Sequence, residues 1–286
     1  MQLLRIVSID SMSLFLCLLL FGVFHQSHAQ DQNVIAVIPP FMDRQHTDES
    51  GSPLQMTRQR FILLLYRNAA AIYSEADFIN TGDDTITAEL GLPSTGYLEK
   101  NTTLFPYQSN GLLGVRLWVS GERLEPDVKY DGPIQWYTIN PDFPPGGSTN
   151  LKALFWVQTS LTDVDSIAGL DTVEISDGER GLLIDVAGAA VWREAVNTIE
   201  ITVMMREGLT SQDTLVVDPD NYDASDSTIG WTMHNVEPSL FDNILVKYSS
   251  GIHHVSKSDT MEKLAEYIER RGYDELLEYI DQLDEE

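Results

Sequence analysis

Apolar and polar positions alternate along most of the chain, most clearly in residues 71–93. Two sets of side chains each share one face there: Ile72, Ser74, Ala76 and Phe78, then Ile86, Ala88, Leu90 and Leu92. The residues between them, 80–84, read Asn-Thr-Gly-Asp-Asp and contain a glycine suited to a turn. Alternation on both sides of such a turn predicts an antiparallel hairpin with one buried face, which Pro93 ends because proline cannot donate to a sheet.

Short apolar or alternating segments of strand length recur along the rest of the chain. They are residues 33–38, 59–66, 113–120, 134–139, 151–159, 198–205, 229–236 and 243–248. Their spacing of roughly ten residues and the frequent Gly/Pro turns are typical of β-sandwiches rather than of a parallel α/β sheet. We therefore expect a mostly β fold, with one or two antiparallel, immunoglobulin-like β-sandwich units.

The pattern changes to a helical one at residue 257. Met261, Leu264, Ala265 and Ile268 follow the spacing of an amphipathic helix, after a candidate cap at Asp259. A second helix is expected to begin at Asp274 and to present Leu276, Leu277, Ile280 and Leu283. Helices this short need a surface to cover. We therefore expect a helical hairpin docked on a sandwich face or on another chain, rather than a flexible acidic tail.

The N-terminus has the features of a signal peptide. Arg5 precedes an apolar stretch at residues 14–24, which is short for a bilayer core of about 30 Å, and residues 27–29 form a small-x-small cleavage site. Cleavage after residue 29 removes Cys17, the chain's one cysteine, so no disulfide is expected. We expect a secreted, periplasmic or cell-envelope protein with no membrane insertion after cleavage.

Four segments follow from these patterns. They are a signal peptide (1–29), an N-terminal β-sandwich (30–125), a C-terminal β-sandwich (126–256) and a helical appendage (257–286).

The formal net charge is -26, which argues against nucleic acid or an anionic membrane as a partner. Two interpretations remain for the acidity: a solubilising surface suited to salty surroundings, which we favour, and binding of divalent cations.

One acidic loop is the candidate metal site. Asp218, Asp220, Asp223 and Asp226 could supply oxygen ligands to Ca²⁺, although the order of residues does not match an EF-hand. We favour a solvated turn over this Ca²⁺ site, and we expect no cofactor, with calcium as the one alternative.

Catalytic candidates are fewer. Glu237 and Asp242 could be a carboxylate pair for glycoside hydrolysis, which requires two carboxyl groups across a cleft. His253 and His254 are adjacent, so on a strand they would point to opposite faces and not bind one ion. We expect Glu237 and Asp242 to shape a loop between strands, and the two histidines to be exposed or hydrogen-bonded after the last strand. We name no catalytic residue.

Trp118 is the candidate for stacking on a ligand. It occupies the polar phase of its segment, whereas Trp136, Trp156 and Trp231 lie within apolar strands and are expected in the core. Asn101 begins a glycosylation sequon, which matters only where the source glycosylates.

Several short motifs resemble secreted bacterial β-sandwich proteins of unknown function. They are residues 80–82, 91–93, Trp136 with 143–146, 192–193, and 237–238 with 242–244. The resemblance implies fold and export and supplies no catalytic residues.

We therefore expect an exported, non-catalytic interaction or structural module with a protein or glycan partner. An extracellular glycan- or calcium-binding domain is the alternative, and a secreted hydrolase comes third. A flat face bearing tryptophan favours a binding protein, whereas His, Asp and Trp gathered in one concave pocket favour a hydrolase.

Overall fold

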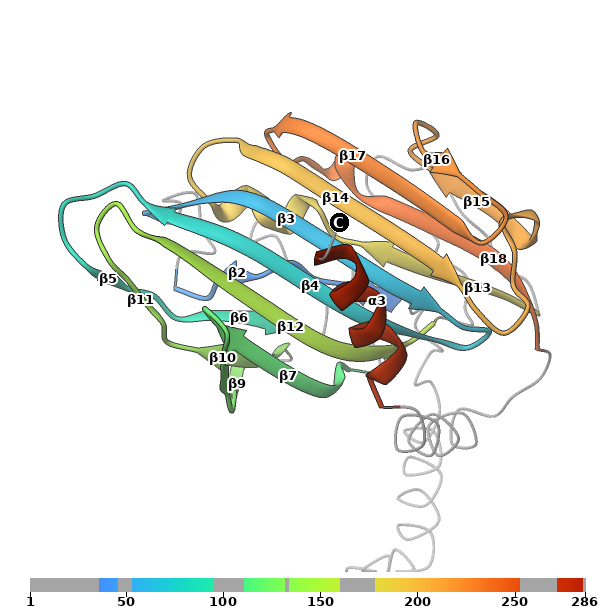
Figure 1. Cartoon of the computed structure of the whole chain (residues 1–286), viewed down its shortest axis with the longest axis horizontal. Helices are drawn as coiled ribbons and strands as arrows, with labels where there is room; N and C mark the ends of the chain where they lie inside the picture. The colour runs from blue at the N-terminus through green and yellow to red at the C-terminus, as the bar shows by residue number, and fades with distance from the viewer. Residues whose placement is uncertain are drawn as a thin grey trace, which may run out of the picture. The chain divides into compact units, whose positions relative to one another are not determined.

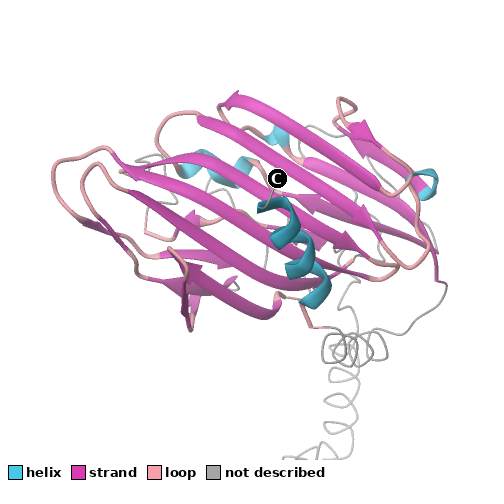
Figure 2. Cartoon of the chain, viewed as in Figure 1, coloured by secondary structure: helices cyan, strands magenta, loops and turns pink. Residues whose placement is uncertain are grey.

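The computed structural model describes residues 36–45, 53–94, 111–131, 134–159, 178–252 and 272–284, all within one compact unit, 33–286. The expected signal peptide, the sequon at Asn101, the histidine pair and the first tail helix lie outside the described residues. Most of the described chain is strand (Figure 2), which confirms the expected mostly β class.

The largest sheet has eight strands in the order β16-β17-β14-β3-β4-β12-β7-β8 (Figure 1). Their bounds are β3 (Leu54–Leu65), β4 (Ala69–Asn80), β7 (Leu113–Val119), β8 (Glu122–Leu124), β12 (Ser148–Gln158), β14 (Val196–Met205), β16 (Asp223–Ala224) and β17 (Thr228–Val236). All neighbours are antiparallel except β14 and β3, which run parallel.

Three smaller sheets accompany it. The first has the order β1-β13-β18-β15, the second β2-β6-β10-β9, and the third pairs β11 with β5. Their bounds are β1 (Ala36–Ile38), β2 (Met42–Asp43), β5 (Ile86–Thr87), β6 (Leu90–Pro93), β9 (Asp127–Asp131), β10 (Ile134–Ile139), β11 (Asp142–Phe143), β13 (Gly178–Ile184), β15 (Thr214–Asp218) and β18 (Ile244–Ile252).

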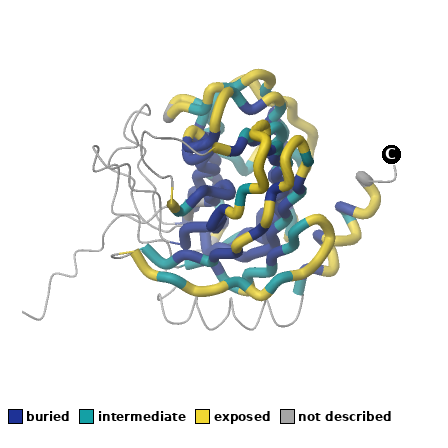
Figure 3. The backbone as a smooth tube through the Cα atoms, turned by 90° about the vertical axis from the view of Figure 1, so that its left-hand side faces the viewer, coloured by how far each residue is buried: buried dark blue, intermediate teal, exposed yellow. Residues whose placement is uncertain are grey.

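One cluster of buried side chains joins the large sheet to the smaller ones. Phe61 and Ile72 come from the large sheet, Leu182 and Val246 from the β13-β18 pair, and Leu92 from β6. The sheets therefore pack as layers around a shared core, which Figure 3 shows as the dark segments. We call the side of the large sheet that faces this core its inner face.

The strands before and after residue 125 belong to the same large sheet. β12, which follows the expected domain division at 125/126, lies between β4 and β7, which precede it. β14 likewise pairs with β3. The large sheet therefore crosses the expected division.

The hairpin expected in residues 71–93 has the right burial and the wrong pairing. Ile72, Phe78 and Leu92 all enter the core. However, β4 pairs with β3 and β12, whereas β6 pairs with β2 and β10. The buried Asn80 amide donates to the carbonyl oxygens of Asp84 (2.7 Å) and Phe143 (2.9 Å), and this turn carries the chain into another sheet.

β4 is buried on both faces along its first half. It pairs with β12 from Ala69 opposite Gln158 to Ile79 opposite Ser148. Ile72 belongs to the shared core, whereas Ala71 and Tyr73 belong to a second buried cluster on the opposite, outer face.

The helix α3 (Asp274–Asp284) covers that outer face. Leu276 and Ile280, one turn apart, are 1% and 4% exposed and pack in the same cluster as Ile62 and Trp156. The expected start at Asp274 and the expected docking of this helix are confirmed. Leu277 was wrongly placed on the buried side: it is 36% exposed, because it lies about 100° around the helix from Leu276.

Polar contacts also hold α3 at the sheet. The Glu275 carboxylate accepts hydrogen bonds from Tyr66 (3.0 Å) and Arg206 (2.5 Å), and the Tyr273 hydroxyl donates to the carbonyl oxygen of Gly114 (2.6 Å). The Arg116 guanidinium lies 4.8 Å from the centre of the Tyr273 ring.

No helix among the described residues is long and apolar enough to cross a membrane.

Docking of α3 predicts a difference between two adjacent leucines. Leu276→Ala should lower the free energy of unfolding by about 2–3 kcal/mol, because it leaves a cavity under the helix. Leu277→Ala should change it by less than about 0.5 kcal/mol, because that side chain is largely in solvent. Denaturant unfolding of both variants checks this, and equal effects would contradict the docked arrangement.

Candidate functional site

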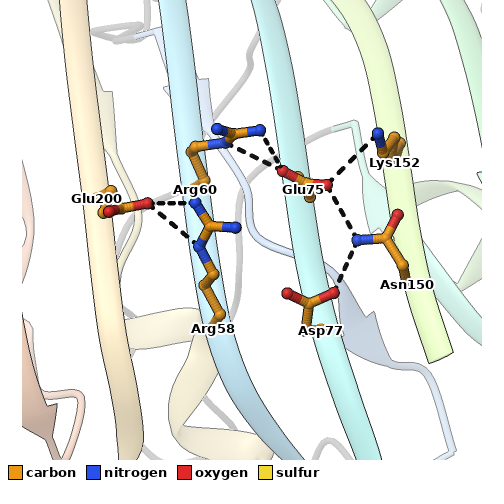
Figure 4. A network of polar contacts seen from close by, with 7 residues as sticks. All are labelled: Arg58, Arg60, Glu75, Asp77, Asn150, Lys152 and Glu200. Atoms are coloured by element: carbon orange, nitrogen blue, oxygen red, sulfur yellow. Dashed lines mark hydrogen bonds and ion pairs between the residues drawn. The ribbon is translucent and has the colours of Figure 1, made fainter. Parts of the chain in front are cut away.

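Charged side chains occupy the outer face of the large sheet beside the apolar area that α3 covers. They come from the neighbouring strands β14, β3, β4 and β12, and Figure 4 shows how they lie. We call this set the outer-face network: Arg58 and Arg60 on β3, Glu75 and Asp77 on β4, Asn150 and Lys152 on β12, and Glu200 on β14. Because strand side chains alternate, Arg60 shares its face with Ile62, which α3 covers.

Glu75 is the centre of this network. Strand register places it opposite Arg60 on one side and Lys152 on the other. Its carboxylate lies 2.6 Å from the Arg60 guanidinium and 3.5 Å from the Lys152 ammonium, and it accepts a hydrogen bond of 3.0 Å from the Asn150 amide. One acidic group therefore links three strands.

Two further contacts extend the network. The Asn150 amide also donates to Asp77 at 2.7 Å, and Arg58 donates to one oxygen of Glu200 at 2.6 and 3.2 Å. The Arg58–Glu200 pair is more exposed than the Arg60–Glu75 pair. It is therefore expected to contribute less to stability.

The surroundings of Glu75 keep it ionised at neutral pH. Burial alone would raise the pKa of this carboxyl, but Arg60, Asn150 and Lys152 together hold its pKa below the ordinary 4.5. A catalytic acid needs the opposite shift. The arrangement suits a fixed, charged surface better than proton transfer.

Tyr73 lies next to the network, toward α3. The Arg60 guanidinium is 5.7 Å and the Lys152 ammonium 5.9 Å from the centre of its ring. Burial, and then the nearby Glu75, raise the pKa of Tyr73, which Lys152 and Arg60 partly offset. The phenol is therefore neutral at physiological pH.

Trp118 is the cross-strand neighbour of Lys152 on this same face. Leu117 enters the inner core and Trp118 points to the outer side, so the expected phase of the segment is confirmed. Trp118 is half-buried rather than free, because it packs beside the α3 cluster. Trp136, Trp156 and Trp231 are buried as expected.

The four aspartates of the candidate calcium loop are spread along it. Asp218 ends β15 and is half-buried, Asp223 lies in β16, and Asp220 and Asp226 are exposed in the connecting turns. Across the described ranges, no three His, Cys, Asp or Glu side chains are grouped so that they could hold a metal ion. The structure thus does not bring these aspartates together as ligands.

Glu237 and Asp242 line one shallow depression of 430 Å³ together with His234. Asp242 accepts hydrogen bonds from the backbone N–H and the hydroxyl of Ser239, both at 2.7 Å, and so caps the short 3₁₀ helix η3 (Leu240–Asp242). Glu237 is exposed. Asp242 thus has the loop-shaping role that was expected for it.

Asp185 is the described carboxyl whose pKa is raised most clearly. Asp185 is 5% exposed, and burial raises the pKa of its carboxyl from 3.8 to about 6. Hydrogen bonds from the Gly188 N–H (3.0 Å) and from Asn243 lower the pKa and offset part of this rise. Gly188 lies in the first turn of the short 3₁₀ helix η1 (Ala187–Val191), so the bond from its N–H ties Asp185 to the start of that helix. Its environment therefore explains a structural role.

The outer-face network itself was not anticipated from the sequence. Its signal is present: Arg58 and Arg60 occupy the polar phase of one strand, and Glu75 and Asp77 that of the next. Opposite charges on facing phases of adjacent strands indicate cross-strand pairs. The strand pairing that brings Lys152 beside Glu75, and Glu200 beside Arg58, cannot be predicted from these local patterns.

Comparisons with known proteins support the fold only. No protein-family description and no curated protein matches the sequence. Among solved structures, the chain is similar to a candidate nutrient-binding protein from Legionella pneumophila, with 11% identity, a TM-score of 0.53, and coverage of 76% of this chain and 73% of the other. It also aligns with M1 zinc metallopeptidase structures from Deinococcus radiodurans at TM-scores of 0.36 and 0.37, with 12% and 11% identity, over 69% and 75% of this chain and only 43% and 44% of theirs.

The network predicts a contrast between its two glutamates. Glu75→Gln should cost about 2 kcal/mol of unfolding free energy, because Arg60 and Lys152 lose their counter-charge in a largely buried position. Glu200→Gln, in the exposed pair, should cost less than about 1 kcal/mol. Urea unfolding of both variants at pH 7 tests this contrast, and equal costs would refute the assignment.

The contribution of Glu75 to stability should also depend on pH. Because its pKa is lowered on folding, that contribution is present above pH 4.5 and is lost as the pH falls below it. Urea unfolding of the natural chain and of Glu75→Gln between pH 3 and 7 measures this dependence.

Asp185 predicts the opposite pH dependence. Its pKa is raised on folding, so its favourable contribution is present below pH 3.8 and is lost as the pH rises through about 6. Asp185→Asn cannot ionise. Relative to the natural chain, this variant should therefore gain up to about 3 kcal/mol in stability between pH 4 and pH 7. A stability difference that stays constant over this range would contradict the raised pKa.

Proposed function

We propose that this chain is an exported, non-catalytic protein that acts as an interaction module in the cell envelope or the extracellular space. The observation that carries the proposal is the outer-face network: its charges are fixed by mutual contacts, and the side chains of Arg58, Lys152 and Glu200 remain about one third exposed. Side chains held in place before a partner arrives lose little conformational freedom on binding. Such a surface favours recognition.

The environments of the carboxyl groups also support a role without catalysis. The pKa of Glu75 is lowered, and Asp185, whose pKa is raised, is buried and accepts a hydrogen bond from the Gly188 N–H. Glycoside hydrolysis needs one carboxyl with a raised pKa facing another across a cleft. Glu237 and Asp242 share a shallow depression, and Asp242 is engaged with Ser239.

Export is the part of the proposal that rests on sequence alone. It depends on the apolar residues 14–24, the cleavage pattern at 27–29 and the loss of Cys17 with that segment. Membership of a secreted β-sandwich family with immunoglobulin-like units belongs to the same proposal. The described role of the Legionella neighbour, nutrient binding, is in keeping with a binding protein and adds no residue-level support.

Glycan binding is the second candidate, and Trp118 is the observation that favours it. Its ring lies on the outer face of the large sheet, beside Lys152 of β12. Asn150 is two residues before Lys152 on β12 and therefore lies on the same face. An aromatic ring next to fixed polar groups can stack on a sugar while the polar groups bind its hydroxyls. A tryptophan on a sheet face, outside a concave pocket, supports a binding protein over a hydrolase.

Photo-crosslinking tests the interaction surface. A photoreactive residue placed at Trp118 should capture a macromolecule in cells that export the protein. One placed at Tyr130, an exposed position on the edge strand β9, should not. Equal capture at both positions, or at neither, would refute the outer face as the interaction surface.

A glycan array separates the two candidates. If the partner is a glycan, Trp118→Ala should weaken retention of the mature chain about tenfold, or ~1.4 kcal/mol, and Tyr130→Ala should not. Retention unaffected by Trp118→Ala would rule out the glycan candidate. Cleavage of a retained glycan by the purified chain would contradict the non-catalytic role.

A further inference from the structure

The shallow depression beside the end of β17 combines apolar and acidic side chains. It has a volume of 430 Å³, and the residues that line it include Met233 and His234 of β17. One wall comes from Pro219, in the connection between β15 and β16, and the other from Glu237 and Phe241, in the connection between β17 and β18. None of these residues belongs to the outer-face network.

Phe241 is the most exposed of the large apolar side chains described. It is 77% exposed and lines the depression, to which Met233 and Val236 add half-buried apolar surface. An aromatic ring left in water costs free energy that a partner can recover by covering it. Aromatic side chains of this kind commonly act as anchors in protein interfaces.

The two walls of the depression are held by buried or paired groups. Trp231, which is buried, donates from its indole N–H to the carbonyl oxygen of Pro219 at 3.1 Å, and the Tyr222 ring lies 5.8 Å from the Trp231 ring. On the other side, Asp242 and Ser239 form a reciprocal cap directly next to Phe241. The depression is thus preformed, so little ordering is needed when a partner binds.

The electrostatics of this region are one-sided. The sequence has no Lys or Arg between Arg206 and Lys247, whereas acidic residues occur throughout this segment. Glu237 and Asp242 line the depression itself, and Asp220 is exposed next to Pro219 in its wall. A bound segment with positive charge would find complementary charge on both sides of the aromatic ring.

We propose that this depression is a docking site for a cationic peptide segment of a partner protein. The segment places an apolar side chain against Phe241 and Met233, and its Lys or Arg side chains approach Glu237 and Asp220. This combination of an exposed aromatic anchor and acidic rim requires apolar and cationic groups on the same ligand. A bare metal ion fits poorly, because the described acidic side chains are not grouped as ligands.

The test uses the mature chain, residues 30–286, and immobilised 12-residue peptides randomised at their apolar positions. Three libraries carry Lys, Gln or Glu at the same charged positions. The Lys library should retain the protein, the Gln library should retain it more weakly and the Glu library not at all. Retention should fall as NaCl rises, because exposed charges are screened within about 10 Å at 0.1 M.

Variants locate the binding surface. Phe241→Ala should reduce retention at least tenfold, and Glu237→Gln and Asp220→Asn should each reduce it about threefold. Tyr130→Ala, an exposed aromatic residue on β9, serves as the matched control and should leave retention unchanged. All four positions are exposed, and unchanged circular dichroism and melting temperature establish that each variant is folded.

The outcomes are separable from those of the outer face. Trp118→Ala should leave peptide retention unchanged, so loss of one surface does not imply loss of the other. The proposal is overturned if the three libraries are retained alike, if no peptide is retained, or if retention is indifferent to Phe241→Ala. A calcium site would also overturn it. In that case calorimetry would detect Ca²⁺ binding to the natural chain but not to Asp220→Asn, and added Ca²⁺ would abolish peptide retention.

Discussion

The position of β4 between β3 and β12 is the constraint on which the other features depend. A strand paired on both edges and buried on both faces needs a layer on each side, because every exposed apolar side chain would otherwise remain in water. The smaller sheets supply one layer, through side chains that meet Ile72 and Phe78. On the other side α3 covers Ala71 and Tyr73. The C-terminal helix is therefore part of the fold rather than an addition to it.

The same register explains why the outer-face network exists. Beyond the area that α3 covers, the outer positions of β3, β4 and β12 are charged, and pairing places Arg60, Glu75 and Lys152 in one row. Their mutual neutralisation permits a largely buried carboxylate, whose pKa is lowered despite burial. We propose this fixed sheet face as one recognition surface and the shallow depression at the end of β17 as a second, differently charged one.

Side-chain phase was predictable from the sequence, because burial is imposed residue by residue. Ile72 and Phe78 in β4, and Leu276 and Ile280 in α3, lie on the expected sides. Strand pairing was not predictable: the turn at Asn80 looks like a hairpin but leads to another sheet, because hydrogen bonds to Asp84 and Phe143 redirect the chain. The parallel contact of β14 with β3 and the outer-face network likewise depend on residues distant in sequence. Local patterns carry no information about such register.

Hydrogen–deuterium exchange tests the dependence of the central strands on α3 most directly. Amide exchange is compared between the full chain and a chain that ends at residue 271 and so lacks α3. If the helix completes the outer layer, its removal should speed exchange in β3, β4 and β12, whose outer side chains it covers, and should leave β13 and β18 unchanged. Unchanged exchange in β4 would contradict the account, because it would mean that the outer face needs no cover.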